Sequence, residues 1–434
     1  MQRRRVVITG MGCITPLGHS VPALWHNALA GASGISPTEL FDARTFTSNF
    51  SGQVKNFVLA DHIGDPGVHA HAARGAQFAL AAAQQAWNQA GLDHAAPDPD
   101  RVGVYLGAGL GEPDFDNFAS LLADSWRPPT AESPRGHLDS VRWAQLAFAR
   151  MSELHEMEQE PNMPASHLAI RFTARGPNLS CLTACAASTQ ANGESVAAIR
   201  HGEADIMISG GCHAMVHPLG VTGFIRLTAL SRRNDSPQTA SRPFDLTRDG
   251  FVMGEGASVI ILEDYDHALR RNATMLAEVI GYGSNADAYR ITDTPPDGRG
   301  GAECMRRALA DAGITKDEID CICAHGTGTR DNDRSETQAI KAVFGDRAPH
   351  IPVTSPKSMI GHLIAAAGTT ELILCIMAIR DGVIPPTINL HTPDSDCDLD
   401  YVPNVARRTT VRTVMNNSFG FGGQNDCIIA RRID

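Results

Sequence analysis

The fold of this chain is decided where a strand pattern gives way to a helix pattern, in the stretch Asn178-Leu-Ser-Cys-Leu-Thr-Ala-Cys-Ala-Ala-Ser-Thr-Gln190. Residues 178–184 are predicted to form a buried strand, and residues 186–200 a helix that ends at Gly202. The thiol of Cys185 would then lie at the first turn of the helix, where unsatisfied backbone N–H groups lower a thiol pKa. Because the thiolate is the reactive form, Cys185 is a candidate nucleophile. A buried, unreactive cysteine is the commoner interpretation of such a residue on its own.

A second corner of the same kind follows downstream. In Thr354-Ser-Pro-Lys-Ser-Met-Ile-Gly-His-Leu363, Lys357 and His362 precede a predicted helix over residues 363–380. We interpret this corner as the duplicate of the one at Cys185. The two helix N-termini are then expected to face each other across an approximate twofold axis, which would gather the cysteine, the lysine and the histidine in one site.

A third turn, Ala324-His-Gly-Thr-Gly-Thr329, contains His325 and follows an apolar strand. Glycine lets a backbone approach a ligand closely, and Thr327 and Thr329 could hydrogen-bond a polar thioester arm. A histidine at a strand end is more often structural, but the presence of the other two corners favours a functional role for His325.

The C-terminal stretch over residues 416–425 is rich in glycine and small residues. A backbone N–H between glycines can serve as an oxyanion donor. A plain glycine-rich hairpin is the alternative interpretation of this stretch.

The same succession of elements occurs twice in the chain. A helix over 72–90 ends at Gly91 and precedes a strand over 101–107, and a helix over 301–312 ends at Gly313 and precedes a strand over 319–324. Alternation of helices and strands indicates α/β layering. We therefore predict an internal duplication whose second copy begins near Met275.

Residues from about 112 to 165 interrupt this rhythm and are predicted to be an insertion with one or two exposed helices. The acidic run over 151–160 contains His155, but its spacing matches no standard metal-ligand motif. A solvated helix face is the expected structure.

Composition excludes several classes of protein. With a net charge of −11, the chain is not expected to bind nucleic acid non-specifically. No apolar run is long enough for a transmembrane helix, and the N-terminus is predicted to be a strand rather than a signal peptide. The ten scattered cysteines, Cys181 among them, favour reduced thiols in a reducing compartment. The glycine pattern at residues 281–286 lacks the helix that a Rossmann site requires, and no P-loop is present.

Taken together, the motifs resemble those of β-ketoacyl-[acyl-carrier-protein] synthases, and most closely the type II elongating condensing enzymes of bacterial fatty-acid synthesis. The resemblance covers nearly the whole chain. It rests on Val7-Ile-Thr-Gly-Met-Gly12, Thr183-Ala-Cys-Ala186, Ser241-Arg-Pro-Phe-Asp-Leu-Thr-Arg-Asp-Gly-Phe-Val-Met-Gly-Glu-Gly-Ala257, Ala324-His-Gly-Thr-Gly-Thr329, Lys357-Ser-Met-Ile-Gly-His362, Pro385-Pro-Thr-Ile-Asn-Leu390 and Asn417-Ser-Phe-Gly-Phe-Gly-Gly423.

The resemblance implies the α/β thiolase fold, with two duplicated βαβ halves that form a five-layered α-β-α-β-α core. Residues 1–273, including the insertion at about 112–165, would carry the nucleophile, and residues 274–434 the two catalytic histidines. It also implies a cytoplasmic homodimer whose partner is acyl carrier protein, with no membrane contact. No metal or redox cofactor is expected, because phosphopantetheine arrives on the carrier.

The same resemblance implies roles for single residues. Cys185 would accept the acyl chain as a thioester, and His325 and His362 would promote decarboxylation of malonyl-carrier protein, whose carbanion extends the chain by two carbons. The remaining expected roles are electrostatic organisation by Lys357 held by Glu371, an oxyanion hole from the N–H groups of Cys185 and Phe421, a gate at Phe421 with Phe224 near it, and phosphopantetheine contacts from Thr327 and Thr329.

Three departures from the family pattern concern the carrier and the acyl group. The segment over residues 65–72, where relatives carry lysine and arginine, has neither. Either Arg74, or arginines around the insertion such as Arg127, Arg135 and Arg142, are expected to substitute for it. The insertion is longer than in typical members, and Pro356 replaces the usual serine or threonine.

Three alternative functions share some of these features. A polyketide-type or specialised-lipid ketosynthase would share all these motifs, so this alternative stays open. A non-catalytic chain-length factor is disfavoured because Cys185, His325, Lys357 and His362 are all present. A biosynthetic thiolase is disfavoured because Cys427 lies in an apolar strand.

Overall fold

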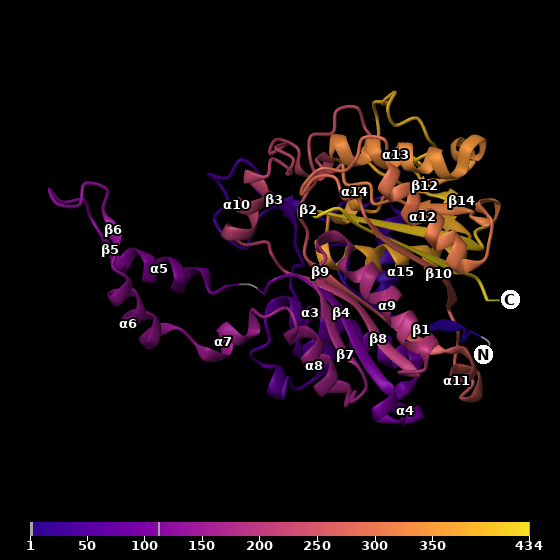
Figure 1. Ribbon diagram of the computed structural model, residues 1–434, viewed down its shortest axis with the longest axis horizontal. Helices are drawn as coiled ribbons and strands as arrows, with labels where there is room; N and C mark the ends of the chain where they lie inside the picture. Colours follow the sequence, from indigo (N-terminus) through magenta and orange to yellow (C-terminus); the bar gives the residue numbers. More distant parts are fainter. Residues whose placement is uncertain (1–2, 112, 434) are drawn as a thin grey trace.

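Ten strands form one sheet in the computed structural model, which describes residues 3–111 and 113–433 (Figure 1). Residues 1, 2, 112 and 434, where the predicted halves and the predicted insertion begin or end, lie outside the described residues. From one edge to the other the strands are β12 (Val353–Thr354), β11 (Cys321–Cys323), β15 (Thr413–Gly420), β16 (Gln424–Arg431), β10 (Ala277–Ala286), β1 (Val6–Ile14), β9 (Gly256–Asp264), β8 (Ile206–His213), β4 (Val102–Ala108) and β7 (Asn178–Cys181).

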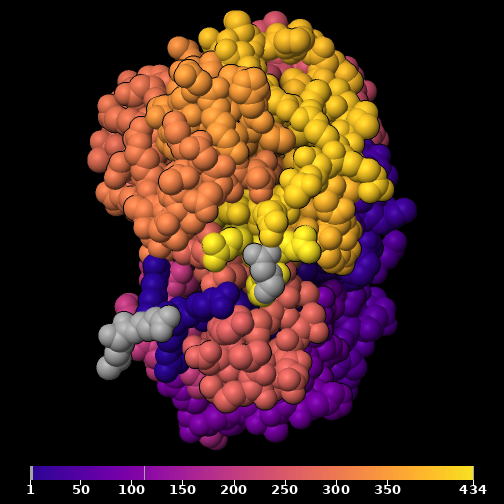
Figure 2. Space-filling model, turned by 90° about the vertical axis from the view of Figure 1, so that its right-hand side faces the viewer, coloured from indigo at the N-terminus to yellow at the C-terminus, as the bar shows by residue number. Residues whose placement is uncertain are grey.

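The sheet repeats one arrangement of five strands. Counted from the edges inward, β7-β4-β8-β9-β1 and β12-β11-β15-β16-β10 have the same pairing pattern, with three parallel strands followed by two antiparallel ones. The two sets join where β1 pairs with β10. This confirms the predicted internal duplication. Figure 2 shows the second half, orange to yellow, stacked above the first. The division at residues 273 and 274 stays a prediction.

Two helices form the central layer between the halves. α9 (Ala187–His201) packs on β4 and β8, and α15 (Ala367–Asp381) packs on β15 and on α9. Every residue of α15 from Ala367 to Ile379 is buried, as expected for a helix that is apolar on all sides. Buried hydrogen bonds join the two helices, including one from the Asn192 amide to Thr369 Oγ1 at 2.9 Å.

Helices on the outer faces complete five layers. α3 (Arg74–Ala90) and α8 (Met163–Phe172) cover the first half, and α12 (Arg299–Ala312) and α13 (Arg330–Phe344) cover the second. α3 ends at Gly91 and α12 at Gly313, both in the left-handed conformation that lets glycine close a helix. The α/β, five-layered core predicted above is therefore confirmed.

The strand before Cys185 is not buried, contrary to the prediction. β7 is the outermost strand on its side of the sheet. Its residues are exposed or half-buried, and Leu179 is 49% exposed. An apolar run can form an edge strand as readily as a central one, so hydrophobicity alone cannot distinguish the two.

The insertion projects from the core as an arm (Figure 1). The arm consists of α5 (Phe115–Ser125), a short β5–β6 hairpin (Trp126–Arg127 and His137–Leu138), α6 (Ser140–Arg150) and α7 (Glu153–Glu158). It is larger than the one or two helices predicted. It also ends earlier than predicted, because α8 begins at Met163 and packs on α3.

The predicted solvated acidic face is wrong at one residue, Glu158. Its carboxylate is buried and accepts hydrogen bonds from the backbone N–H of Ala73 at 3.1 Å and from His167 Nε2 at 3.0 Å. His167 Nδ1 in turn lies 2.9 Å from His69 Nδ1. Glu158 therefore anchors the base of the arm to the core.

The remaining helices and strands are short. They are α1 (Val21–Leu29), β2 (Ile35–Pro37), β3 (Phe50–Gly52), α2 (Ala60–Ile63), α4 (Leu92–Ala95), α10 (Pro218–Arg226), α11 (Tyr265–Arg270), α14 (Lys357–Ile360), β13 (Val383–Ile384) and β14 (Arg407–Arg408). Residues 281–286 lie inside strand β10, which confirms that they form no Rossmann turn. Within the described residues, no helix is long and apolar enough to cross a membrane.

The contact between the central helices predicts a stability effect. A Cβ on Gly368 would lie 1.9 Å from Thr189 Oγ1 and 2.9 Å from Ser418 Oγ. We expect Gly368→Ala to lower the free energy of unfolding by about 1–3 kcal/mol because the buried helices must separate. Denaturant unfolding measures this change. Gly223→Ala on α10, where a Cβ would meet nothing within 4 Å, is the matched control; an equal effect of both variants would contradict the prediction.

Candidate active site

Cys185 lies at a strained corner between the edge strand and the central helix. A single 3-10 turn, Ala184–Ala186, joins β7 to α9, and Ala184 has φ 49°. Left-handed backbone is unfavourable for a residue with a Cβ, and such strain is typical of functional sites. The strand-to-helix corner predicted from the sequence is confirmed.

The corner that precedes α15 has the same geometry. The 3-10 turn Ile364–Ala366 leads into α15, and Ile364 has φ 46°. The two turns are in contact with each other. The expected meeting of two duplicated helix N-termini at the centre of the molecule is therefore confirmed.

His362 is held by hydrogen bonds to its backbone and to one ring nitrogen. Its N–H donates to Val252 O at 2.7 Å, and its carbonyl accepts from Gly254 N at 2.9 Å. The ring atom Nδ1 accepts from the N–H of Ile364 at 3.2 Å. In the neutral ring the hydrogen is therefore on Nε2, which has no partner among the described residues.

His325 follows β11 and is fixed by a buried carboxylate that the sequence reasoning missed. Glu336 on α13 accepts from the backbone N–H of His325 at 2.9 Å and of Gly326 at 2.8 Å. Burial raises the pKa of Glu336 to about 7. The available signal was the position of Glu336 on the same helix face as Ala339, Ile340 and Val343, which are also buried.

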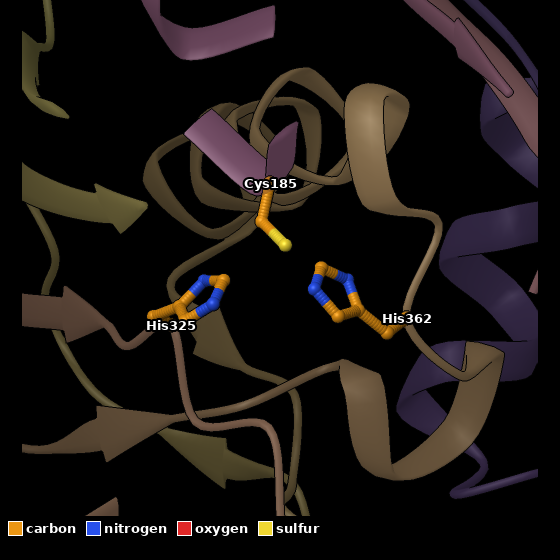
Figure 3. A group of neighbouring side chains, drawn as sticks. All are labelled: Cys185, His325 and His362. Atoms are coloured by element: carbon orange, nitrogen blue, oxygen red, sulfur yellow. The ribbon is translucent and has the colours of Figure 1, made fainter. Parts of the chain in front are cut away.

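The three predicted reactive side chains meet, as Figure 3 shows. The Sγ of Cys185 and a nitrogen from each of His325 and His362 all lie within 4.8 Å of one another. The imidazole rings are 5.3 Å apart between centroids at 80°. Two aromatic neighbours that the sequence reasoning did not single out flank them, Phe251 beside His362 and Phe419 beside His325.

The thiol pKa contradicts the expectation from the helix N-terminus. Burial raises the pKa of Cys185 to about 11, although the charge of Lys357 and the backbone N–H groups of Phe421 and Cys185 lower it. The expected lowering is present but smaller than the cost of placing a thiolate away from water. The resting group is therefore the protonated thiol at neutral pH.

Both imidazoles are neutral at the same pH. Burial and the nearby charge of Lys357 hold the pKa values of His325 and His362 well below their usual range. Neutral imidazole can accept a proton or donate a hydrogen bond, whereas imidazolium can only donate.

Lys357 is paired with Glu371, as predicted. Its ammonium group donates to Glu371 Oε1, and both side chains are almost fully buried. Burial raises the pKa of Glu371 to about 7, against the opposing effect of Lys357. The charge of Lys357 lowers the pKa values of Cys185, His325 and His362, and Glu371 opposes this effect at Cys185.

The glycine-rich C-terminal stretch is both a hairpin and part of the site. β15 and β16 pair up to Gly420 and Gln424, and the turn between them holds Phe421. The backbone N–H groups of Phe421 and Cys185 face the sulfur. A Cβ on Gly420 would lie 2.9 Å from Thr183 O, so this close approach requires glycine.

A pocket of about 510 Å³ leads from the surface to Cys185. Besides the three reactive residues, its walls include Thr327, Thr329 and Phe421. The phosphopantetheine contacts of the two threonines and the gate at Phe421 stay predictions. The Thr327 and Thr329 hydroxyls lie 3.0 Å apart, and the Thr329 hydroxyl also caps α13. Phe224 does not line the pocket; it packs beside Cys185 in an apolar cluster, edge-on to Phe251 at 5.6 Å.

One cysteine and two histidines at this spacing could also bind a metal ion such as Zn²⁺. Metal binding requires the thiolate, which burial disfavours here. The expected absence of a metal stays a prediction.

Comparisons with known proteins agree along the whole chain. Residues 3–268 match the model of the β-ketoacyl synthase N-terminal domain, and residues 276–391 that of the C-terminal domain. The 3-oxoacyl-[acyl-carrier-protein] synthase 2 of Coxiella burnetii is 41% identical, with 100% of each chain covered. That of Staphylococcus aureus is 39% identical, covering 100% of this chain and 99% of its own.

Solved structures agree as well. A type II polyketide ketosynthase, in complex with its acyl-carrier protein and bound to the hexaketide, matches with a TM-score of 0.87 and 36% identity, and 100% of each chain is covered. The fold is therefore that of ketosynthases, and the chain belongs to the β-ketoacyl synthase family.

Proposed function

We propose that this protein is a β-ketoacyl-[acyl-carrier-protein] synthase, an acyltransferase that elongates a fatty acyl chain by decarboxylative condensation with malonyl-carrier protein. The observation that carries the proposal is the placement of a thiol and two neutral imidazoles within 4.8 Å at the base of an open pocket. The names of its relatives support the substrate class.

The first step transfers the acyl group to Cys185. The thiol proton passes to a neutral imidazole, and Sγ bonds to the acyl carbonyl carbon. The carrier's sulfur leaves and takes up the proton. The N–H groups of Cys185 and Phe421 face this position and stabilise the negative oxygen of the tetrahedral intermediate. The covalent intermediate divides one difficult condensation into two easier steps, acylation of Cys185 and carbon–carbon bond formation.

The second step forms the carbon–carbon bond. Loss of CO2 from the malonyl group leaves an enolate, whose oxygen accepts hydrogen bonds from the imidazoles. His362 is suited to this role because its free Nε2 carries the hydrogen. The enolate carbon attacks the Cys185 thioester, and the thiolate that leaves takes up one proton. Decarboxylation supplies the carbanion, so no strong base is needed.

Lys357 is a positioning residue in this mechanism. Its charge lowers the pKa values of the thiol and of both imidazoles, and Glu371 fixes its ammonium group. The reaction as proposed uses no metal or redox cofactor, because phosphopantetheine enters on the carrier. Thr327 and Thr329 line the path of that arm.

The carrier docks at the pocket mouth rather than on most of the arginines expected from the sequence. Arg74 binds the buried carboxylate of Glu255 at 2.7 Å, Arg127 pairs with Asp139, and Arg142 donates to the carbonyl of Asp124. Exposed Arg135 stays a candidate.

Two exposed arginines are better placed for an acidic carrier. Arg330 lines the pocket, and Arg226 directly precedes Leu227, which also lines it. Neither forms an ion pair within the described residues, 3–111 and 113–433.

We also propose a homodimer in the cytoplasm, without nucleic-acid or membrane contacts. The exposed edge strand β7 supports dimerisation, together with exposed Leu182 beside it and Val141 and Phe148 on the arm. All ten cysteines are free, which supports a reducing compartment. The net charge of −11 supports the absence of nucleic-acid binding.

A polyketide ketosynthase is the second candidate, because the matched structure of that class covers the whole chain. The two candidates differ in the number of condensations per priming group. A single two-carbon extension by the wild-type enzyme supports fatty acyl elongation, and repeated extension without intervening reduction supports polyketide synthesis.

Removal of the nucleophile should separate the two half-reactions. We expect Cys185→Ala to lower condensation by at least about a thousandfold, while malonyl-carrier decarboxylation persists because both imidazoles remain. Product analysis by mass spectrometry measures both activities. Condensation at the wild-type rate would contradict the assignment of Cys185.

The raised thiol pKa predicts the pH dependence of labelling. Iodoacetamide reacts with the thiolate, so labelling of Cys185 should rise about tenfold per pH unit across the neutral range, without a plateau below its pKa of about 11. Lys357→Met should slow labelling at a given pH, because the Lys357 charge lowers this pKa. Peptide mass spectrometry separates Cys185 from the other cysteines; a plateau near pH 7 would contradict the prediction.

Charge reversal at the pocket mouth should weaken carrier binding. We expect the double variant Arg226→Glu, Arg330→Glu to raise KM for malonyl-carrier protein by about tenfold and to leave KM for malonyl-pantetheine unchanged. Arg270→Glu is the control, because Arg270 is exposed on α11, which lies well apart from α10 in Figure 1. Equal KM values for the carrier in wild-type and double variant would show that docking lies elsewhere.

A further inference from the structure

The two reactive histidines belong to separate segments of the chain, although their ring centroids lie 5.3 Å apart (Figure 3). His325 follows β11 and opens the turn over residues 325–329, whereas His362 follows α14 in the corner that starts at Ser355. The proposed enolate step requires both imidazoles to face one oxygen atom. A contact that fixes one segment against the other therefore controls that step.

The hydroxyl of Ser355 joins the two segments. It donates to the carbonyl of Gly326, the residue after His325, at 2.6 Å. This contact continues the parallel pairing of β11 with β12, in which the N–H of Ala324 donates to the carbonyl of Thr354 at 2.9 Å. Ser355 is fully buried and does not line the active-site pocket, so it acts on the site only through the backbone.

The segments also approach each other closely at this point. Gly326 has φ 37°, and a Cβ at this position would lie 2.7 Å from the Cβ of Ser355. The N–H groups of His325 and Gly326 donate to the buried carboxylate of Glu336. The turn is thus held through its N–H groups by Glu336 and through a carbonyl by Ser355. Of these two residues, only Ser355 lies in the segment that carries His362.

Ser355 is itself fixed within its own segment. Its N–H donates to Thr387 Oγ1 at 2.9 Å, and its carbonyl accepts from Ser358 Oγ at 2.8 Å. Pro356, which departs from the family pattern, is buried, and its ring holds φ at −62° at the start of α14. The backbone between Ser355 and Lys357 therefore has little freedom to move.

We propose that Ser355 is a positioning residue for decarboxylative condensation, whose hydroxyl keeps the imidazole of His325 in place relative to that of His362. This inference rests on the proposed function, because it concerns a step in which both imidazoles act on one enolate oxygen. Loss of the hydroxyl leaves the Gly326 carbonyl without this donor and lets the His325 turn move. A displacement of about 1 Å in a catalytic group can lower a rate by about a hundredfold.

The reactivity of the thiol should not depend on this contact. The pKa of Cys185 is set by burial, by the charge of Lys357 and by backbone N–H groups, and not by the turn of His325. Lys357 is also held independently of Ser355, because its carbonyl accepts from the hydroxyl of Ser241 at 2.7 Å. Alkylation of Cys185 therefore reports whether the rest of the site is intact.

The test measures two rates for each variant. Labelling of Cys185 by iodoacetamide is followed by peptide mass spectrometry. Separately, the enzyme is hexanoylated to completion with hexanoyl-pantetheine and mixed with malonyl-pantetheine, and β-ketoacyl product per acylated site is measured in a single turnover. We expect Ser355→Ala to lower the maximal rate of bond formation by about tenfold. The half-saturating concentration of malonyl-pantetheine and the labelling rate should stay close to the wild-type values.

Two variants serve as controls. Ser355→Thr keeps the hydroxyl and should keep the rate of bond formation close to that of the wild type. Because this rate is measured per acylated site, partial unfolding of a variant does not change it. Ser195→Ala removes an equally buried hydroxyl, which donates to Ser209 Oγ at 3.0 Å between α9 and β8, and should change neither rate.

Each outcome has a distinct meaning. Selective loss of bond formation in Ser355→Ala, together with both control results, supports the proposal. Bond formation at the wild-type rate in Ser355→Ala, an equal loss of both rates, or the same selective loss in either control would overturn it. If the wild-type protein is not hexanoylated or forms no β-ketoacyl product, the proposed function fails, and the inference that rests on it fails with it.

Discussion

The meeting of two buried helix N-termini at the centre of the molecule is the constraint on which the structure depends. Each helix follows a 3-10 turn with one left-handed residue, Ala184 before α9 and Ile364 before α15. The duplicated strand order brings these turns into contact, and buried hydrogen bonds between the helices hold them there. This contact positions the thiol of Cys185 and the imidazole of His362.

Burial determines the chemistry as strongly as position does. The same environment raises the thiol pKa and lowers the pKa values of both imidazoles. It thereby produces a resting state with a neutral thiol and neutral imidazoles, in which Lys357 is the nearby positive charge. Acylation then requires a proton transfer within the site, and enolate formation has uncharged hydrogen-bond donors beside it. A fully exposed cysteine at the same helix terminus would be reactive but unselective.

Much of this arrangement could be predicted from the sequence because it follows local patterns. Residues close together in the chain determine where two helices end, at Gly91 and at Gly313. The same is true of the corner at Cys185 and of its duplicate before α15. Long-range packing was not accessible in the same way. The edge position of β7 depends on topology, and the burial of Glu158 depends on a histidine and a backbone N–H in other elements.

Two further differences between the sequence-based predictions and the structure also arise from long-range packing. Arg74 appeared available for a carrier, but Glu255, far away in the sequence, binds it. Glu336 was missed because an acidic residue on a helix is usually solvated, whereas the fold turns this one toward the backbone of His325. The balance of effects on the thiol also required the structure, since a helix N-terminus and burial shift the pKa in opposite directions.

The central claim is that this geometry makes Cys185, alone among ten free cysteines, the acyl acceptor. Peptide mapping after incubation of the wild-type protein with an isotopically labelled acyl-carrier protein, without malonyl donor, tests it most directly. The account predicts one hydroxylamine-labile acyl group, on the peptide that contains Cys185. An acyl group on another residue, or no covalently attached acyl group at all, would contradict it.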